Sequence, residues 1–263
     1  MTQNNIIISI EGNIGSGKST LLASLQDYFK NNKKIIFLRE PLDEWEGITD
    51  DNGTSMLKLF YEDQKQHSFS FQIMALITRL ALLKEAIKNN PNSIIITERS
   101  LYTDKMVFAK MLYDTKNIES HNYKIYLKLF DTFVFDYKID HIVYVNTSPE
   151  ICYERIAKRS RDGESNISLE YLTKCHDYHN EMLSDVSLFK DQWIYDGNIE
   201  LHKNKANFDI LIQKIKHKKK LMNIIYSNLN LENIIESKEN LNKLIDKLKH
   251  QHQLINTIYK IEK

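Results

Sequence analysis

Five short apolar runs recur along the chain, and we predict that they form β-strands. Each run is four to six residues long and rich in β-branched or aromatic side chains, which is typical of buried strands. They are Ile6–Ile10, Lys34–Leu38, Ser93–Thr97, His141–Asn146 and Gln192–Tyr195.

Between these runs, apolar residues recur at every third or fourth position, the spacing of a helix that buries one face. Such patterns cover Leu21–Lys30, Phe69–Asn89, Asp104–Tyr113 and Asn122–Phe135. Strands that alternate with helices predict an α/β domain, with a five-stranded parallel sheet and helices on both faces.

Polar segments follow the first three predicted strands directly. Gly12–Thr20 follows the first strand, Glu40 the second, and Glu98-Arg99 the third. Because ligands of such sheets bind beyond the carboxyl ends of the strands, we expect the three segments to form one site.

The segment Gly12–Thr20 reads GNIGSGKST and fits the phosphate-loop pattern without a mismatch. A strand precedes it and a helix follows it, whereas a glycine-rich turn without a ligand would not need that context. Its backbone N–H groups would surround the phosphates of a nucleoside triphosphate, Lys18 would reach the β- and γ-phosphates, and Ser19 would hold Mg²⁺. The predicted nucleotide-binding residues are Gly12, Asn13, Ile14, Gly15, Ser16, Gly17, Lys18, Ser19 and Thr20.

Bulk properties exclude some classes of function. The 263 residues carry a net charge of +1, which argues against a general nucleic-acid or membrane-surface binder. No apolar run is long enough to span a bilayer, and no secretory or transit segment precedes the first strand, so we expect a cytoplasmic protein. Cys152 and Cys175 lack metal-site or redox spacing.

The sequence changes character near residue 220. We assign residues 1–219 to the catalytic domain and 220–263 to a helical extension of unknown role. Spaced apolar residues favour a helix that packs on the domain over an oligomerisation zipper; they are Leu241, Ile245, Leu248 and Ile255. The basic run Lys214–Lys220 is interpreted as a solvated helix end.

Two carboxylates and a group of arginines complete the chemistry of a phosphoryl transfer. Glu98 ends an apolar run, where a second metal-binding group belongs. Glu40 precedes a proline and can accept a proton from an attacking hydroxyl. The arginines Arg155, Arg159 and Arg161 would close over phosphates as a lid, although exposed basic helices are also common.

Together these residues resemble the deoxyribonucleoside kinases of the deoxycytidine and deoxyguanosine kinase type. The resemblance runs from about Ile6 to Tyr178 and fades after about Tyr195. It implies a P-loop kinase fold with a mobile arginine lid, ATP as donor, nucleotide salvage and a homodimer through helices beside the sheet. It rests on Glu40–Trp45, Leu57-x-x-Phe60-Tyr61, Phe69–Gln72, Glu98-Arg99-Ser100, Asp104, the arginines and Leu169-Glu170-Tyr171.

The resemblance also implies individual roles. Glu40 would be the general base for the 5′-hydroxyl of the nucleoside and Arg99 would orient that hydroxyl, while Lys18, Arg159 and Arg161 would act on the phosphates. Tyr61 and Glu164 would bind the sugar 3′-hydroxyl and leave little room for a ribose 2′-hydroxyl. The remaining pocket residues are Phe71 and Phe108 against the base, Trp45 and Leu57 around them, and Gln72 on the base edge. Phe60 and Phe69 are assigned to the core.

Arg79 and Asp104 give a prediction about the base. Relatives that accept deoxycytidine or deoxyguanosine have this pair, whereas relatives that accept thymidine have apolar or small residues there. A guanidinium cannot accept a hydrogen bond and an ionised carboxylate cannot donate one. We therefore predict deoxycytidine and purine deoxynucleosides over thymidine.

Three alternative functions are compatible with part of these features. A nucleoside monophosphate kinase of the thymidylate kinase kind shares this sheet, but it would not need Glu40 as a base. A GTP-dependent switch is disfavoured, because no strand leads into Asp50–Gly53 and Asn204–Asn207 lacks the Asp that reads guanine. An inactive scaffold is disfavoured by the intact Lys18 and Glu98.

Overall fold

The computed structural model describes residues 5–134, 137–159, 164–185, 189 and 191–229. It divides into two compact units, 1–212 and 213–263. All five predicted strands are present, each within one residue of its predicted ends: β1 (Ile6–Glu11), β2 (Ile35–Leu38), β3 (Ile94–Glu98), β4 (His141–Asn146) and β5 (Gln192–Asp196).

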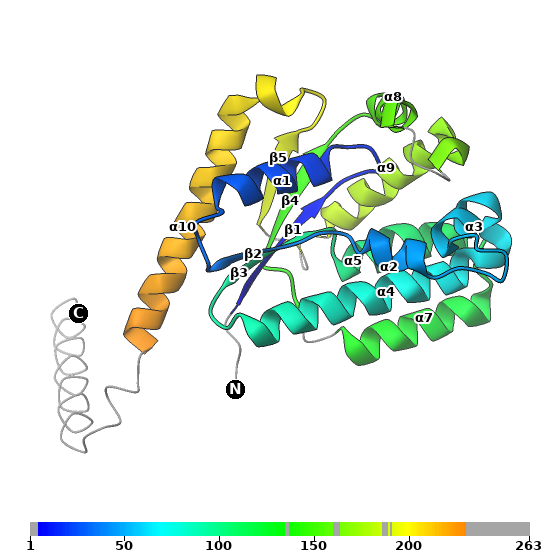
Figure 1. Cartoon of the computed structure of the whole chain (residues 1–263), viewed down its shortest axis with the longest axis horizontal. Helices are drawn as coiled ribbons and strands as arrows, with labels where there is room; N and C mark the ends of the chain where they lie inside the picture. The colour runs from blue at the N-terminus through cyan, green and yellow to red at the C-terminus, as the bar shows by residue number, and fades with distance from the viewer. Residues whose placement is uncertain (1–4, 135–136, 160–163, 186–188, 190, 230–263) are drawn as a thin grey trace, which may run out of the picture. The chain divides into compact units, whose positions relative to one another are not determined.

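The first unit is an α/β domain (Figure 1). Its helices are α1 (Lys18–Tyr28), α2 (Leu42–Gly47), α3 (Met56–Glu62), α4 (Gln64–Asn89), α5 (Leu101–Thr103), α6 (Lys110–Asp114), α7 (Ser120–Phe133), α8 (Pro149–Arg159) and α9 (Leu169–Ser184). The helix α10 (Lys205–Leu229) begins in this unit and continues into the second one. Three short turns complete it: the π-helical η1 (Asp104–Ala109) and the 3₁₀-helical η2 (Glu164–Asn166) and η3 (Leu201–Lys203).

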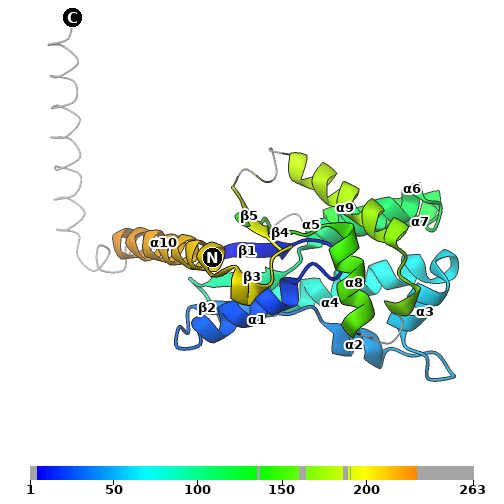
Figure 2. The ribbon, with the colours of Figure 1, turned by 90° about the horizontal axis from the view of Figure 1, so that it is seen from above.

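The five strands form one parallel sheet in the order β2-β3-β1-β4-β5. From β1 the chain crosses to β2 at the edge of the sheet, and from β2 it returns to β3, which lies between these two strands. Because both connections are right-handed but run in opposite directions across the sheet, α1 and α4 lie on opposite faces. Figure 2 gives a second view of the strands with the helices packed around them. The sheet and its two helical layers agree with the fold predicted from the sequence.

The core lies around β1 and β3, the central part of the sheet. Ile8, Ile10 and Ile94–Ile96 are wholly buried. On one face, Leu76 and Leu80 of α4 pack with residues of α7. These apolar layers hold the carboxyl ends of β1, β2 and β3 rigidly side by side, which is the edge where the polar segments follow.

Helix α4 begins five residues before its predicted start. The Asp63 side chain accepts a hydrogen bond from the Gln66 backbone N–H and so caps the helix. Similarly, α1 begins at Lys18, because the left-handed Gly17 (φ 103°) directly precedes it. Polar first turns carry no apolar period, which is why the spacing alone placed both starts too late.

The predicted regular helix over Asp104–Tyr113 is wrong in detail. The segment begins with the π-helical turn η1, directly after α5, and continues into α6. A π-helical turn has one more residue in each hydrogen-bonded loop than an α-helix, and it occurs often at functional sites. Nothing in the apolar spacing of this segment distinguishes the two.

Within the described residues, no helix combines the length and apolar character needed to cross a membrane. Helix α10 carries the basic run Lys214–Lys220. The apolar positions Leu241, Ile245, Leu248 and Ile255 lie outside the described residues.

Candidate active site

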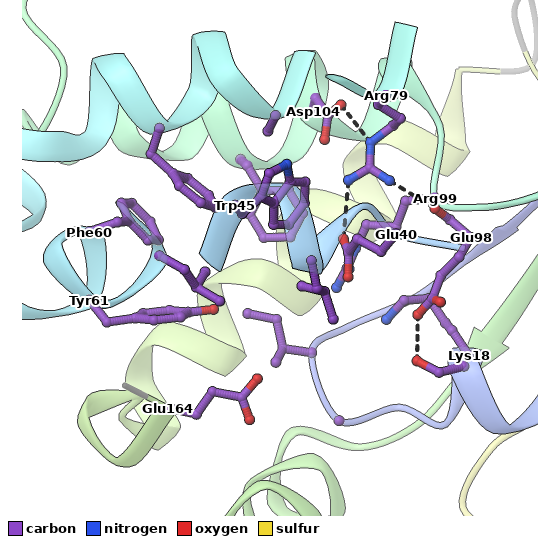
Figure 3. Close-up of a pocket in the computed structure, with 18 of the residues that line it drawn as sticks. Lys18, Glu40, Trp45, Phe60, Tyr61, Arg79, Glu98, Arg99, Asp104 and Glu164 are labelled. Atoms are coloured by element: carbon purple, nitrogen blue, oxygen red, sulfur yellow. Dashed lines mark hydrogen bonds and ion pairs between the residues drawn. The ribbon is translucent and has the colours of Figure 1, made fainter. Parts of the chain in front are cut away.

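A pocket of about 320 Å³ lies at the carboxyl ends of β1, β2 and β3 (Figure 3). This volume is at the lower end of the range for small-molecule sites. Its walls come from the phosphate loop, α2, α3, α4, η1, α8, η2 and α9. The lining residues are Ile14, Gly15, Gly17, Lys18, Ser19, Thr20, Glu40, Leu42, Trp45, Leu57, Phe60, Tyr61, Phe71, Gln72, Ala75, Arg79, Glu98, Arg99, Asp104, Phe108, Arg155, Arg159, Glu164 and Tyr171.

The phosphate loop packs closely against its neighbours. Gly12 has φ 143°, and a Cβ atom there would lie 2.6 Å from the Val145 carbonyl oxygen, so only glycine fits. Asn13 turns its side chain away from the pocket: its amide nitrogen donates to the Leu172 carbonyl at 2.8 Å, and its amide oxygen accepts from the Ile14 N–H. Of the nine predicted loop residues, Gly12, Asn13 and Ser16 do not line the pocket.

Lys18 is buried at the base of the pocket, and its ammonium donates to the Asn13 carbonyl at 2.6 Å. Burial is the main cause that lowers the pKa of Lys18 to about 7, and the positive charge of the nearby Arg99 contributes to this shift. In the free protein the ammonium is therefore held in a site that disfavours its charge. The negative charge of a triphosphate at this position would favour the charged form of Lys18 and raise its pKa.

This pKa predicts how ATP binding depends on pH. Above about pH 7 the free protein loses the Lys18 proton, so we expect the dissociation constant for ATP to rise up to about tenfold per pH unit. Calorimetry at about pH 8 in buffers of different ionisation enthalpy should detect about one proton taken up on binding. Lys18→Met should abolish that uptake. Binding by the unchanged protein without proton uptake would contradict the prediction.

Ser19 and Glu98 meet beside the loop. The Ser19 hydroxyl donates to Glu98 Oε1 at 2.5 Å, and Glu98 is the last residue of β3. A hydroxyl and a single carboxylate are the protein ligands that Mg²⁺ commonly takes when phosphates supply the rest. No cluster of three or more His, Cys, Asp or Glu side chains suited to a metal occurs in the described part of the chain. In their chemistry, the Ser19 hydroxyl and the Glu98 carboxylate would fit a Mg²⁺ ion whose other ligands came from a nucleotide.

Glu40 lies between two arginines. The guanidinium groups of Arg79 and Arg99 both donate to Glu40 Oε1, at 3.1 and 2.7 Å (Figure 3). Burial opposes the ionisation of Glu40, but Arg99 and Arg79 outweigh it and lower its pKa to about 2. Glu40 Oε2 accepts no hydrogen bond from the described residues, so one oxygen of a fully ionised carboxylate is available to a ligand.

Arg99 reaches this position through an unusual backbone conformation. Its φ of 60° is in the left-handed region, and its N–H donates to the Ile10 carbonyl at 2.9 Å. Non-glycine residues rarely adopt this conformation, and those that do cluster at functional sites. The turn directly after β3 aims the guanidinium at Glu40 and over the ring of Phe108, 5.2 Å from its centroid.

Arg79 donates three hydrogen bonds to three separate segments. Nε donates to Asp104 Oδ2 at 2.9 Å, Nη1 to the Glu98 carbonyl at 2.9 Å, and Nη2 to Glu40. The sequence anticipated that Arg79 and Asp104 lie together, but not that the same guanidinium holds Glu40. Burial raises the pKa of Asp104 to about 6, although Arg79 opposes that rise.

Gln72 lies two turns before Arg79 on α4 and is almost fully buried. Its amide oxygen has no hydrogen-bond partner among the described residues. Because a buried acceptor without a partner costs about 1–3 kcal/mol, this oxygen is positioned for a ligand that donates. The pocket therefore presents fixed polar groups on one side.

Aromatic side chains enclose the other side. The Trp45 indole donates to the Thr78 hydroxyl at 2.9 Å, and its ring packs edge-on against Phe71. Phe60, assigned to the core from its sequence, is buried and stacks on Phe71 at 4.4 Å, but it also lines the pocket. Leu42, Ala75 and Tyr171 line the pocket too. Leu42 and Tyr171 belong to motifs that carry the resemblance, but the sequence predicted a role in the pocket for none of the three.

Tyr61 and Glu164 lie together at the outer end of the pocket (Figure 3). Burial is the main cause that raises the pKa of the Tyr61 hydroxyl, and the negative charge of Glu164 contributes to the rise. The hydroxyl therefore keeps its proton and remains a hydrogen-bond donor. Two guanidinium nitrogens of Arg159 pair with Glu164, with Nε donating to Oε2 at 2.6 Å and Nη2 donating to Oε1. Arg155 donates to the Ser16 carbonyl at 3.2 Å. Both arginines line the pocket, whereas Arg161 lies outside the described residues.

A phosphate loop beside an ionised carboxylate and two arginines defines a kinase that phosphorylates an alcohol. The family model for deoxynucleoside kinases matches residues 8–250, past the point near Tyr195 where the short motifs end. The chain belongs to the deoxynucleoside kinase family, with its P-loop kinase fold.

Several relatives are similar along most of their length. A probable deoxycytidine kinase of Fowlpox virus is 38% identical over 68% of this chain and 72% of its own. Human deoxycytidine kinase is 32% identical over 80% of this chain and 89% of its own, and human mitochondrial thymidine kinase 2 is 33% identical over 70% and 66%. The solved structure of deoxyadenosine kinase from M. mycoides matches with a TM-score of 0.66 and 26% identity, over 81% of this chain and all of that one.

Proposed function

We propose that this deoxynucleoside kinase transfers the γ-phosphate of ATP to the 5′-hydroxyl of a deoxynucleoside, with Glu40 as general base, in nucleotide salvage. The observation that carries the proposal is the state of Glu40: Oε1 holds both arginines, while Oε2 has no partner among the described residues. A neutral hydroxyl is the ligand that such an oxygen accepts best, because Arg79 and Arg99 already neutralise the carboxylate charge.

The low pKa of Glu40 limits when it takes the proton. A carboxylate with a pKa of about 2 is a weak base toward an unreacted alcohol. Phosphoryl transfer has a loose transition state, in which the attacking oxygen becomes acidic only as its bond to phosphorus forms. Glu40 would therefore orient the 5′-hydroxyl first and accept its proton late. Arg99, on the same carboxylate oxygen, fixes that orientation.

On the donor side, Lys18 would contact the β- and γ-phosphates from the base of the pocket, and Ser19 and Glu98 would hold Mg²⁺. When bound, that ion would neutralise phosphate charge. Arg155 and Arg159 line the same pocket, and exchange of their present partners for phosphate oxygens is consistent with their place.

On the acceptor side, Tyr61 and Glu164 are suited to the sugar 3′-hydroxyl, since one donates and the other accepts. Phe71 and Phe108 would contact the base, and Gln72 would bond its edge through the buried amide oxygen that lacks a partner. The fixed Arg79–Asp104 pair favours deoxycytidine and purine deoxynucleosides over thymidine.

A homodimer is part of this proposal. Three large apolar side chains are about half exposed on neighbouring helices: Ile77 on α4, at 54%, and Ile125 and Phe133 on α7, at 49% and 53%. Exposed apolar residues on adjoining helices favour contact with a second copy.

The test is a panel of the four deoxynucleosides with ATP and Mg²⁺, with the four monophosphates alongside. We expect monophosphate products from deoxycytidine and from at least one purine deoxynucleoside, with thymidine the poorest substrate. Thymidine as the best substrate would overturn the base preference. Activity on the monophosphates alone would overturn the assignment of the acceptor.

A further inference from the structure

Glu11 is a buried carboxylate that the proposed reaction does not use. It is the last residue of β1, directly before the phosphate loop, and none of its surface is exposed. Its oxygens accept hydrogen bonds from two hydroxyls, Ser9 at 2.5 Å and Thr103 at 2.5 Å. No ion pair to Glu11 occurs among the described residues. Because burial of a carboxylate without a cation is costly, an apolar residue would suit the end of this strand better.

The contact with Thr103 reaches the wall of the nucleoside pocket. Thr103 ends α5, and the π-helical turn η1 begins at the next residue. Its backbone N–H donates to the Ser100 hydroxyl at 3.2 Å, and its own hydroxyl donates to Glu11. The start of η1 is thus held through both the main chain and the side chain of Thr103.

The turn held in this way carries two pocket residues. Asp104 is its first residue and Phe108 lies one turn further on, and both line the pocket. A π-helical turn is rare and occurs mostly as a single turn at a functional site, so we expect contacts with its surroundings to support its geometry. The anchor is well placed to do so, because β1 lies between β3 and β4 near the middle of the sheet.

We propose that Glu11 is a positioning residue for nucleoside selection: it anchors Thr103, and thereby sets Asp104 against Arg79 and Phe108 against the base. The inference rests on the proposed function, since it takes Asp104 and Phe108 as the residues that face the base. It adds that one carboxylate joins the strand beneath the phosphate loop to the wall that selects the acceptor. Glu11 touches neither substrate.

Ser9 provides a matched control, because Ser9 and Thr103 are both wholly buried and each donates one hydroxyl to Glu11. Ser9 lies on β1 itself, so its hydroxyl does not reach the pocket wall. We expect Thr103→Val to raise the KM for deoxycytidine about tenfold and to raise activity on thymidine relative to deoxycytidine. The KM for ATP should stay within about twofold, and Thr103→Ser should restore the original values.

Ser9→Ala should leave both KM values and the base preference within about twofold of the unchanged protein. If it changes them as Thr103→Val does, or if Thr103→Val leaves the KM for deoxycytidine and the preference unchanged, Glu11 only stabilises the fold and the inference is wrong. Should the valine variant not fold, Thr103→Ala is measured with the same two outcomes. Wild-type protein that phosphorylates no deoxynucleoside would refute the proposed function, whereas an active wild type with an unaffected valine variant refutes only this inference.

Discussion

Glu40→Gln should lower turnover with deoxycytidine about a hundredfold to ten-thousandfold, while deoxycytidine binding is retained. The amide keeps the size of the side chain but cannot accept the proton of the 5′-hydroxyl. It also leaves Arg79 and Arg99 without the negative charge that they share. Because the nucleoside is uncharged, its affinity depends little on that charge. Single-turnover rates and the dissociation constant, measured separately, will distinguish the two effects.

Glu44→Gln is the matched control, since Glu44 is an exposed acid on α2, four residues further along. It should leave turnover unchanged. Unchanged turnover in Glu40→Gln would show that no base is needed at this position, and the monophosphate kinase would then be the better reading. Equal losses of turnover and binding would instead indicate that Glu40 holds the substrate without activating it.

The second large effect is expected from the Arg79–Asp104 pair. With both partners removed, in Arg79→Met with Asp104→Ala, thymidine should gain at least about tenfold in kcat/KM relative to deoxycytidine. Each single substitution leaves a buried partner without its counterpart, at a cost of about 1–3 kcal/mol. Asp104 is the more vulnerable partner, because its pKa of about 6 already lies near neutrality. We therefore expect each single variant to be a poorer deoxycytidine kinase than the unchanged protein.

The neighbouring pair Lys105–Asp131, at 3.2 Å, is a suitable control because Asp131 is exposed and Lys105 is only partly buried. Its double replacement should not change the ratio of thymidine to deoxycytidine activity. A complete double-mutant cycle over Arg79 and Asp104 will separate the loss of the pair from the loss of each side chain. If the double variant keeps the original ratio, the pair does not select the base.

The donor half of the site could be predicted from the sequence because its signals are local. Strand, glycine turn, Lys18 and helix follow one another without a break, and each step limits the next. The same holds for Glu98, which follows three isoleucines and Thr97. Its contact with Ser19 follows from the register, since parallel strands bring their carboxyl ends to one edge.

The acceptor half could be predicted only in part. Family resemblance named Arg79, Asp104 and Gln72, but the bond from Arg79 to Glu40 depends on how α4 lies across the end of β2, which no local pattern encodes. The π-helical turn has the same apolar spacing as a regular helix. Glu11 reads as a polar end to a strand, and only the folded chain reveals its two hydroxyl partners.

The rigid guanidinium of Arg79 links Asp104, which is proposed to select the base, to Glu40, which is proposed to accept the proton. Its three hydrogen bonds leave the guanidinium no freedom to turn toward one partner without releasing another. Lysine has a single ammonium and could not replace the planar fork. Descendants of this enzyme that acquire a new base preference would thus pass through a less active intermediate, unless a second change near Glu40 came first. Adaptation to a new nucleoside is expected to follow a constrained order of mutations, which ancestral reconstruction could recover.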